Sequence, residues 1–85
     1  MAWQWSTVKS ASRDLKKLDI SISKRIAKKL DFWVKSDNPL QFAENLTNSE
    51  LGEYRFRVGD YRIIFDVEGK NIVVLSIGHR KEIYK

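Results

Sequence analysis

The residues in this sequence with the most evident chemistry are three arginines on the two sides of a short turn. Arg55 and Arg57 precede Gly59-Asp60, and Arg62 follows it. Glycine in the first of these positions is what a type II′ turn requires, so Gly59-Asp60 is predicted to be a two-residue hairpin loop. That loop length places Arg57 directly opposite Arg62. Two guanidinium groups in direct cross-strand pairing favour a bound anion between them, and the planar donors of arginine suit a phosphate group.

The residues on both sides of the turn alternate between apolar and polar, which predicts two strands with distinct faces. The apolar face, expected to pack under helices, carries Tyr54, Phe56, Val58, Tyr61, Ile63, Phe65 and Val67. The open face carries the three arginines together with Glu53, Ile64 and Asp66. This open face is either a phosphate-binding surface or a solvated surface on which Glu53 and Asp66 neutralise the arginines.

The carboxyl-terminal segment adds further polar groups to this set. His79, Arg80 and Tyr84 lie at or just beyond the end of a strand predicted from Asn71 to about His79. A second tight turn would place this strand beside the one that contains Arg62, and would bring Arg80 near the other arginines. Arginines can hold a scissile phosphate while a tyrosine or histidine moves a proton, which is a workable set for a nuclease. By position alone, His79 is equally consistent with a structural role and Tyr84 with a frayed end.

The residue types also indicate that such a nuclease would use no metal and no cofactor. The sequence lacks the carboxylate cluster of a two-metal phosphodiesterase, and its single histidine does not supply an acid and base pair. It also lacks cysteine, which excludes a disulfide framework and a thiolate metal site and favours the cytoplasm.

Two helices are predicted ahead of these strands. Residues 2–7 alternate large and polar side chains, with Trp3 and Trp5 on one face, and predict a first strand. Apolar residues then recur at helical spacing in two stretches. The first stretch, with a cap at Ser6 or Thr7, contains Val8, Ala11, Leu15 and Leu18. The second stretch, with a cap at Asp19, contains Ile22, Ile26, Leu30 and Trp33.

The rest of the chain completes an α+β pattern. Pro39 ends the second helix, and residues 39–51 are predicted to be a connector with one helical turn near residues 41–45. The apolar run Ile72–Leu75 predicts a strand inside the sheet. We therefore expect a single domain over residues 1–85: an amino-terminal strand, a helical hairpin and a mostly antiparallel sheet with the helices on one face.

Length and charge limit the possible functions. The chain has 85 residues, a net charge of +5 and a pI near 9.6, which allows one small domain and favours a polyanionic partner. No apolar run is long enough to cross a bilayer, and the amino terminus does not resemble a signal peptide. The lysine-rich helices are interpreted mainly as solvated surface.

Two segments of the sequence resemble the RelE/ParE toxin superfamily. They are Gly52–Phe65 (GEYRFRVGDYRIIF) and Gly78–Tyr84 (GHRKEIY), and the order of the predicted elements agrees with that family. Asp14–Leu18 is also similar to the family's first helix. The resemblance covers essentially the whole chain. It implies a RelE-like ribonuclease fold and the toxin of a type II toxin–antitoxin system.

In the RelE branch, the resemblance implies an mRNA interferase. Such an endoribonuclease enters the ribosomal A site, cuts mRNA with the ribose 2′-hydroxyl as nucleophile and without metal, and thereby inhibits translation. Arg62 matches the arginine that braces the scissile phosphate, and Arg80 the one associated with the leaving group or the transition-state charge. Tyr84 matches the tyrosine that acts on the 2′-hydroxyl as a base.

One part of the site departs from the RelE pattern. Arg55 and Arg57 stand where RelE proper has basic residues that are often lysines. Because arginine stays protonated, these two are expected to hold phosphate and not to relay protons. His79 adjoins Arg80 and is an alternative base or acid.

Two other functions remain open. The ParE branch shares the fold but inhibits DNA gyrase and does not need this residue set, so the presence of Arg62, Arg80 and Tyr84 together favours RelE. A third interpretation is an inactive basic module that only binds antitoxin or RNA. For partners, we expect an acidic antitoxin that folds as it binds, and the ribosome with mRNA in its A site. If the second turn is also two residues long, Val73, Leu75 and Ile77 share the open face and offer a docking site for the antitoxin.

Overall fold

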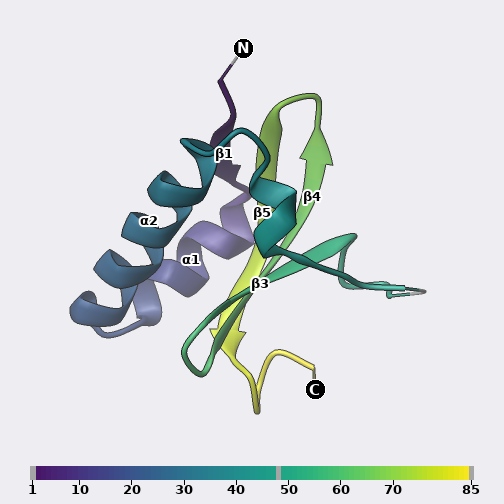
Figure 1. Cartoon of the computed structure of the whole chain (residues 1–85). Helices are drawn as coiled ribbons and strands as arrows, with labels where there is room; N and C mark the ends of the chain where they lie inside the picture. The colour runs from purple at the N-terminus through teal and green to yellow at the C-terminus, as the bar shows by residue number, and fades with distance from the viewer. Residues whose placement is uncertain (1, 48, 85) are drawn as a thin grey trace.

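This protein folds as a β-sheet with α-helices packed against it. The computed structural model describes residues 2–47 and 49–84. Its elements are β1 (Gln4–Thr7), α1 (Lys9–Lys17), α2 (Ile20–Val34), the 3-10 helix η1 (Pro39–Phe42), β2 (Glu44–Asn45), β3 (Tyr54–Val58), β4 (Tyr61–Glu68) and β5 (Asn71–His79). The strand order is β1-β5-β4-β3-β2, with β1 parallel to β5 and the other pairs antiparallel. Both helices lie on the same side of the sheet (Figure 1). The predicted α+β class is confirmed.

The two apolar stripes of the helices face the sheet as predicted. Ile26, Leu30 and Trp33 of α2 are buried, and so is Ala11 of α1. The predicted cap of α1 is wrong, because residue 8 and not residue 6 or 7 precedes the helix. Thr7 pairs with Val74 in the parallel ladder, so the chain stays extended one residue longer. Within the described residues, neither helix has a hydrogen bond from a capping side chain.

The connector after α2 contains a strand that the pattern did not predict. A turn of 3-10 helix forms over Pro39–Phe42, slightly earlier than predicted, and the Asn38 side chain accepts a hydrogen bond from Leu40 N at 3.2 Å. The two-residue strand β2 follows and pairs with β3. Two residues show no periodicity, so this strand exists only through its tertiary pairing.

Both predicted hairpins form with two-residue loops. Arg57 pairs with Arg62 across the first loop, where Gly59 has a φ of 59° that favours glycine. Glu68 pairs with Asn71 across the second loop. The register inferred for the first hairpin is therefore confirmed, and the second turn also has the two-residue length on which the face assignment of β5 depended.

A bulge in β5 changes which residues share the open face. Phe65 pairs with Val74 but Ile64 pairs with Ser76, so Leu75 is an extra residue in β5. Beyond the bulge the alternation is inverted. The expectation that Ile77 lies on the open face is wrong: Ile77 belongs to the buried core, and Gly78 takes the position opposite Arg62.

The core lies between the helices and one face of the sheet. Of the seven residues predicted for that face, Phe56, Val58, Ile63 and Phe65 are buried, and the others pack around them. The opposite face is partly covered. Ile64 is fully buried, and Gly52 packs so closely over it that an added Cβ would lie 2.7 Å from Ile64 Cγ2. No helix in the described parts of the chain is long and apolar enough to cross a membrane.

Candidate phosphate-binding site

A carboxylate that the sequence analysis did not single out lies between two of the predicted site arginines. Glu44 of β2 pairs with Arg55 in the ladder, and its Oε2 atom accepts a hydrogen bond from the Arg55 guanidinium. Its Oε1 atom lies 2.6 Å from Arg57 Nε, and its Oε2 atom lies 3.4 Å from a terminal nitrogen of Arg57. Arg57 in turn pairs with Arg62. Of the two opposed arginines, Arg57 is thus in contact with a carboxylate of the protein itself, whereas the contacts of Arg62 are with backbone carbonyls.

The two carboxylates that were expected to neutralise the arginines have other partners. Asp66 Oδ1 accepts from Glu53 N at 2.8 Å, and Glu53 Oε1 accepts from Val67 N at 3.1 Å. These bonds attach the segment before β3 to β4. The alternative of neutralisation by Glu53 and Asp66 therefore names the wrong carboxylates, because Glu44 is the one that contacts Arg55 and Arg57. A lone glutamate in a predicted connector carries no sequence signal for this role.

Tyr84 reaches the same site from the carboxyl terminus. Arg55 donates a hydrogen bond to the Tyr84 hydroxyl, and its guanidinium carbon lies 5.8 Å from the centroid of the tyrosine ring. The hydrogen bond to Tyr84 raises the pKa of Arg55 above its ordinary value, against the effect of partial burial and with help from Glu44. Arg55 thus stays charged and links the carboxylate to the phenol. Its buried Nε atom has no hydrogen-bond partner among the described residues.

Arg62 is the most buried of the site arginines, with a relative exposure of 9%. One of its terminal nitrogens donates to two carbonyls of the β3–β4 turn, Gly59 O at 2.9 Å and Tyr61 O at 3.0 Å. These bonds restrain the guanidinium at the hairpin end, where a charged group is held in place before any ligand arrives.

Arg80 and His79 lie at the same end of the sheet. Arg80 N donates to Asp60 O at 2.7 Å, and Arg80 Nε lies 3.6 Å from Asp60 Oδ1, so the side chain stands beside the turn. His79 pairs with Tyr61, and the two rings meet edge to face with their centroids 5.5 Å apart. This pairing follows from the bulge and places His79 in register with the residues that face the helices. The structure therefore joins Arg55, Arg57, Tyr84 and the neighbouring Arg62, and sets Arg80 and His79 at the margin.

The ion pairs of Glu44 are expected to stabilise the fold at neutral pH and to lose this effect at acidic pH. The hydrogen bond from Arg55 holds the pKa of Glu44 below its ordinary value of 4.5; partial burial opposes this, and the charges of Arg55, Arg57 and Arg62 add to it. A carboxyl group of this kind stabilises the fold above its unfolded-state pKa and ceases to do so as pH falls through the folded value. We expect Glu44→Gln to lower the free energy of unfolding at pH 7, and the deficit to shrink as pH falls below the ordinary pKa of 4.5 and to vanish below the lower pKa of Glu44 in the folded protein. Urea denaturation from pH 7 to pH 3 measures it, and a pH-independent deficit would contradict the assignment.

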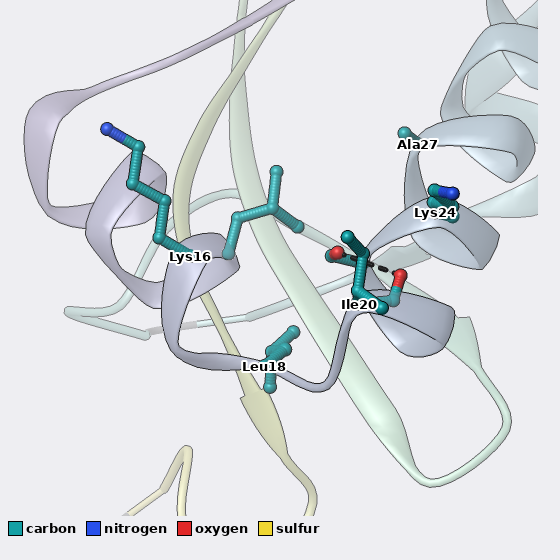
Figure 2. Close-up of a pocket in the computed structure, with 7 residues that line it drawn as sticks. Lys16, Leu18, Ile20, Lys24 and Ala27 are labelled. Carbon is teal, nitrogen blue, oxygen red and sulfur yellow. Dashed lines mark hydrogen bonds between the residues drawn. The ribbon is translucent and has the colours of Figure 1, made fainter.

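A second surface feature differs from the arginine site in its chemistry. Where α1 meets α2, an apolar notch is lined by Leu15, Leu18, Ile20 and Ala27, with Lys16, Ser23 and Lys24 around it. Figure 2 shows Leu18 on the connection between the helices and Ile20 at the start of α2, with Lys16 and Lys24 on either side. This notch offers a place for an aliphatic group and contains no acid–base residue other than lysine. The chemistry expected from the sequence belongs to the open face of the sheet, which carries Arg55, Arg57 and Arg62.

Comparison with known proteins identifies the class to which this fold belongs. Residues 7–84 match the family model of the ParE toxin of the type II toxin–antitoxin system parDE. A chain of the RelB–RelE antitoxin–toxin complex from Methanococcus jannaschii is 30% identical, with a TM-score of 0.71, and the match covers 92% of this chain and 93% of that one. A chain of the RelE–RelB complex from Pyrococcus horikoshii is 25% identical, with a TM-score of 0.73 and coverage of 96% and 99%.

A third structure shares the fold at lower identity. A chain of the toxin–antitoxin complex RelBE2 from Mycobacterium tuberculosis is 23% identical, with a TM-score of 0.81 and coverage of 94% of this chain and 100% of that one. A comparison with curated protein sequences finds no match. The fold is thus that of RelE-type toxins. The chain belongs to the ParE toxin family of type II toxin–antitoxin systems, within the RelE/ParE superfamily.

Proposed function

We propose that this toxin is a metal-independent endoribonuclease that cuts mRNA in the A site of the ribosome and so arrests translation in the cytoplasm. The observation that carries the proposal is the contact of the Tyr84 hydroxyl with Arg55, on the face that also holds Arg57 and Arg62. A gyrase inhibitor has no need of a phenol beside guanidinium groups. A metal-independent phosphodiester cleavage can use both, the phenol to move a proton and the guanidinium groups to hold the phosphate.

In the proposed reaction, the ribose 2′-hydroxyl oxygen bonds to the phosphorus and the bond from phosphorus to the 5′-oxygen breaks. Tyr84 acts as the phenolate, whose negative charge the adjacent Arg55 guanidinium stabilises, and it becomes a neutral phenol when it takes the proton of the 2′-hydroxyl. Arg57 and Arg62 hold the phosphate oxygens, and Arg80 meets the charge that develops toward the leaving group. The 5′-oxygen takes up a proton from water.

The family match favours a second candidate function. Because the matching model describes ParE toxins, inhibition of DNA gyrase is the alternative that an experiment must separate from mRNA cleavage. Induced expression distinguishes the two. A nuclease arrests translation and leaves mRNA cut within A-site codons, whereas a gyrase inhibitor blocks replication and induces a DNA damage response. A module that only binds would do neither.

Tyr84→Phe tests the proposed chemistry at one atom. The variant keeps the ring against Arg55 but loses the hydroxyl, so we expect mRNA cutting to fall by about 10²-fold or more while the fold is retained. Primer extension on mRNA after induction, with wild type and His79→Gln as parallel samples, gives the measurement. Full cutting by Tyr84→Phe together with loss of cutting by His79→Gln would transfer the role of base to His79.

We also propose a cognate antitoxin with an acidic segment that folds as it binds. The likeness to chains from RelB–RelE complexes supports a partner of this kind. Charge adds support, since residues 9–34 contain eight basic and three acidic residues, a net charge of +5 that equals that of the whole chain. The remaining charges balance. The helical hairpin is therefore the part of the surface that attracts an acidic partner most strongly.

A further inference from the structure

We propose that Glu44 is an internal counter-anion, which fills the phosphate position between Arg55 and Arg57 until a phosphate of the RNA displaces it. The identity of the displacing ligand as an RNA phosphodiester rests on the proposed function. The displacement itself does not, because any phosphate that binds the two arginines must compete with the same carboxylate.

The contacts of Glu44 imitate those of a bound phosphodiester. Its two carboxylate oxygens both face guanidinium groups: Oε2 contacts Arg55 and Arg57, and Oε1 contacts Arg57 Nε at 2.6 Å. A phosphodiester has one negative charge shared by two oxygens and can take the same donors. Exchange of one for the other leaves the charge of the site unchanged. A neutral ligand cannot replace Glu44 without leaving two guanidinium groups unneutralised, so the exchange selects for anions.

The exposed fractions of the two side chains indicate that Glu44, and not Arg55, moves when a phosphate binds. The Glu44 side chain is 44% exposed, whereas that of Arg55 is 17% exposed. Glu44 also lies on the edge strand β2, which pairs with β3 at only two positions and continues in one further bond from Leu46 N to Glu53 O at 2.9 Å. A short edge strand of this kind opens at low cost. Glu44 can therefore turn to solvent while Arg55 keeps its place.

A buried donor without an acceptor supports the binding of a further ligand at this site. Arg55 Nε is buried and has no acceptor among the described residues, although the terminal nitrogens of Arg55 contact Glu44 and Tyr84. A buried donor without an acceptor destabilises a protein unless a ligand or water satisfies it. The added oxygens of a phosphate in place of Glu44 would supply that acceptor next to the Tyr84 hydroxyl.

Glu44→Gln tests the displacement through binding, independently of cleavage. The probe is a fluorescent single-stranded RNA trinucleotide with a 2′-deoxy sugar at the cutting position, so that it binds but cannot be cut. We expect the variant to bind this probe roughly five- to tenfold more tightly than wild type at fixed salt, the range implied by loss of two partly exposed ion pairs. Glu68→Gln, at the far end of β4, makes the same change in net charge and is expected to leave affinity within about twofold.

A second measurement follows the arginines directly. Titration with inorganic phosphate is expected to shift the Nε–Hε signals of Arg55 and Arg57 at lower phosphate concentration in Glu44→Gln than in wild type. The same spectra report whether the variant is folded. Equal affinities in the two proteins, or shifts confined to other arginines, would overturn the proposal.

The activity of the same variant separates this proposal from two others. Under the proposal, Glu44→Gln still cuts mRNA. Loss of cutting with unchanged probe affinity would instead make Glu44 a proton acceptor and would overturn the counter-anion role. If wild type cuts no mRNA but Glu44→Gln still binds the probe and phosphate more tightly, the nuclease function fails while the displacement stands.

Discussion

Arg62→Ala is expected to reduce mRNA cutting by about 10²–10³-fold, the usual effect of removing one preorganised donor from a transition-state site. Arg62 lies opposite Arg57 on the face with Tyr84, and two turn carbonyls restrain its guanidinium. Because Arg62 is only 9% exposed, few water molecules screen the charge of its guanidinium group. Because this charge is already in place, it stabilises the pentavalent phosphate without rearrangement during the reaction.

Primer extension on mRNA from cells that express the variant measures this effect. Arg62→Lys keeps the charge but loses the planar set of donors, so we expect it to recover only part of the activity. Arg13→Ala makes the same substitution on the exposed surface of α1 and should cut normally. Loss of the two hydrogen bonds to the turn is expected to cost about 1–3 kcal/mol in Arg62→Ala, and urea denaturation checks that the protein remains folded. Normal cutting by a folded Arg62→Ala protein would remove Arg62 from the site.

Phe56→Ala is expected to have the largest effect on stability, a loss of about 3–5 kcal/mol in the free energy of unfolding. Phe56 is completely buried between two other rings, with centroid distances of 4.1 Å to Trp33 and 4.4 Å to Phe65. Alanine leaves a cavity where α2 meets β3. For a domain of this size the loss corresponds to a fall in Tm of about 12–40 °C.

Thermal denaturation followed by circular dichroism gives the measurement. Phe42→Ala is the matched control because Phe42 is 44% exposed, with its ring centroid 6.4 Å from that of Trp33. We expect it to cost about 1 kcal/mol or less. Phe56 separates Arg55 from Arg57 along β3, so its replacement is also expected to weaken cutting. A change below 1 kcal/mol for Phe56→Ala would show that the ring stack does not anchor the sheet.

Much of this fold follows from local patterns in the sequence. The helical stripe ending at Trp33 predicts which side of α2 is buried, because a helix of this size must place one apolar face against the sheet. The two-residue loop at Gly59-Asp60 predicts the pairing of Arg57 with Arg62, because loop length sets hairpin register. Both features depend on residues close together in the chain, and both are confirmed.

The features that were wrong or absent depend on contacts between distant residues. Leu75 becomes an extra residue in β5 only because the two strands shift by one position, and this shift buries Ile77 and turns His79 toward Tyr61. Strand β2 forms because Glu44 meets Arg55, eleven residues later, and no periodicity in two residues indicates it. A pairing shift and a two-residue edge strand leave no local pattern to detect.

The sequence by itself determined the two helices and the strands other than β2, the register of the first hairpin and the family to which the arginines and Tyr84 point. It also determined the net charge of +5, but not which part of the structure makes use of it. Tertiary structure decided that Glu44 pairs with Arg55 and Arg57, because β2 pairs with β3. Charge is additive along a chain, whereas neutralisation depends on the distance between charges, and the fold sets that distance.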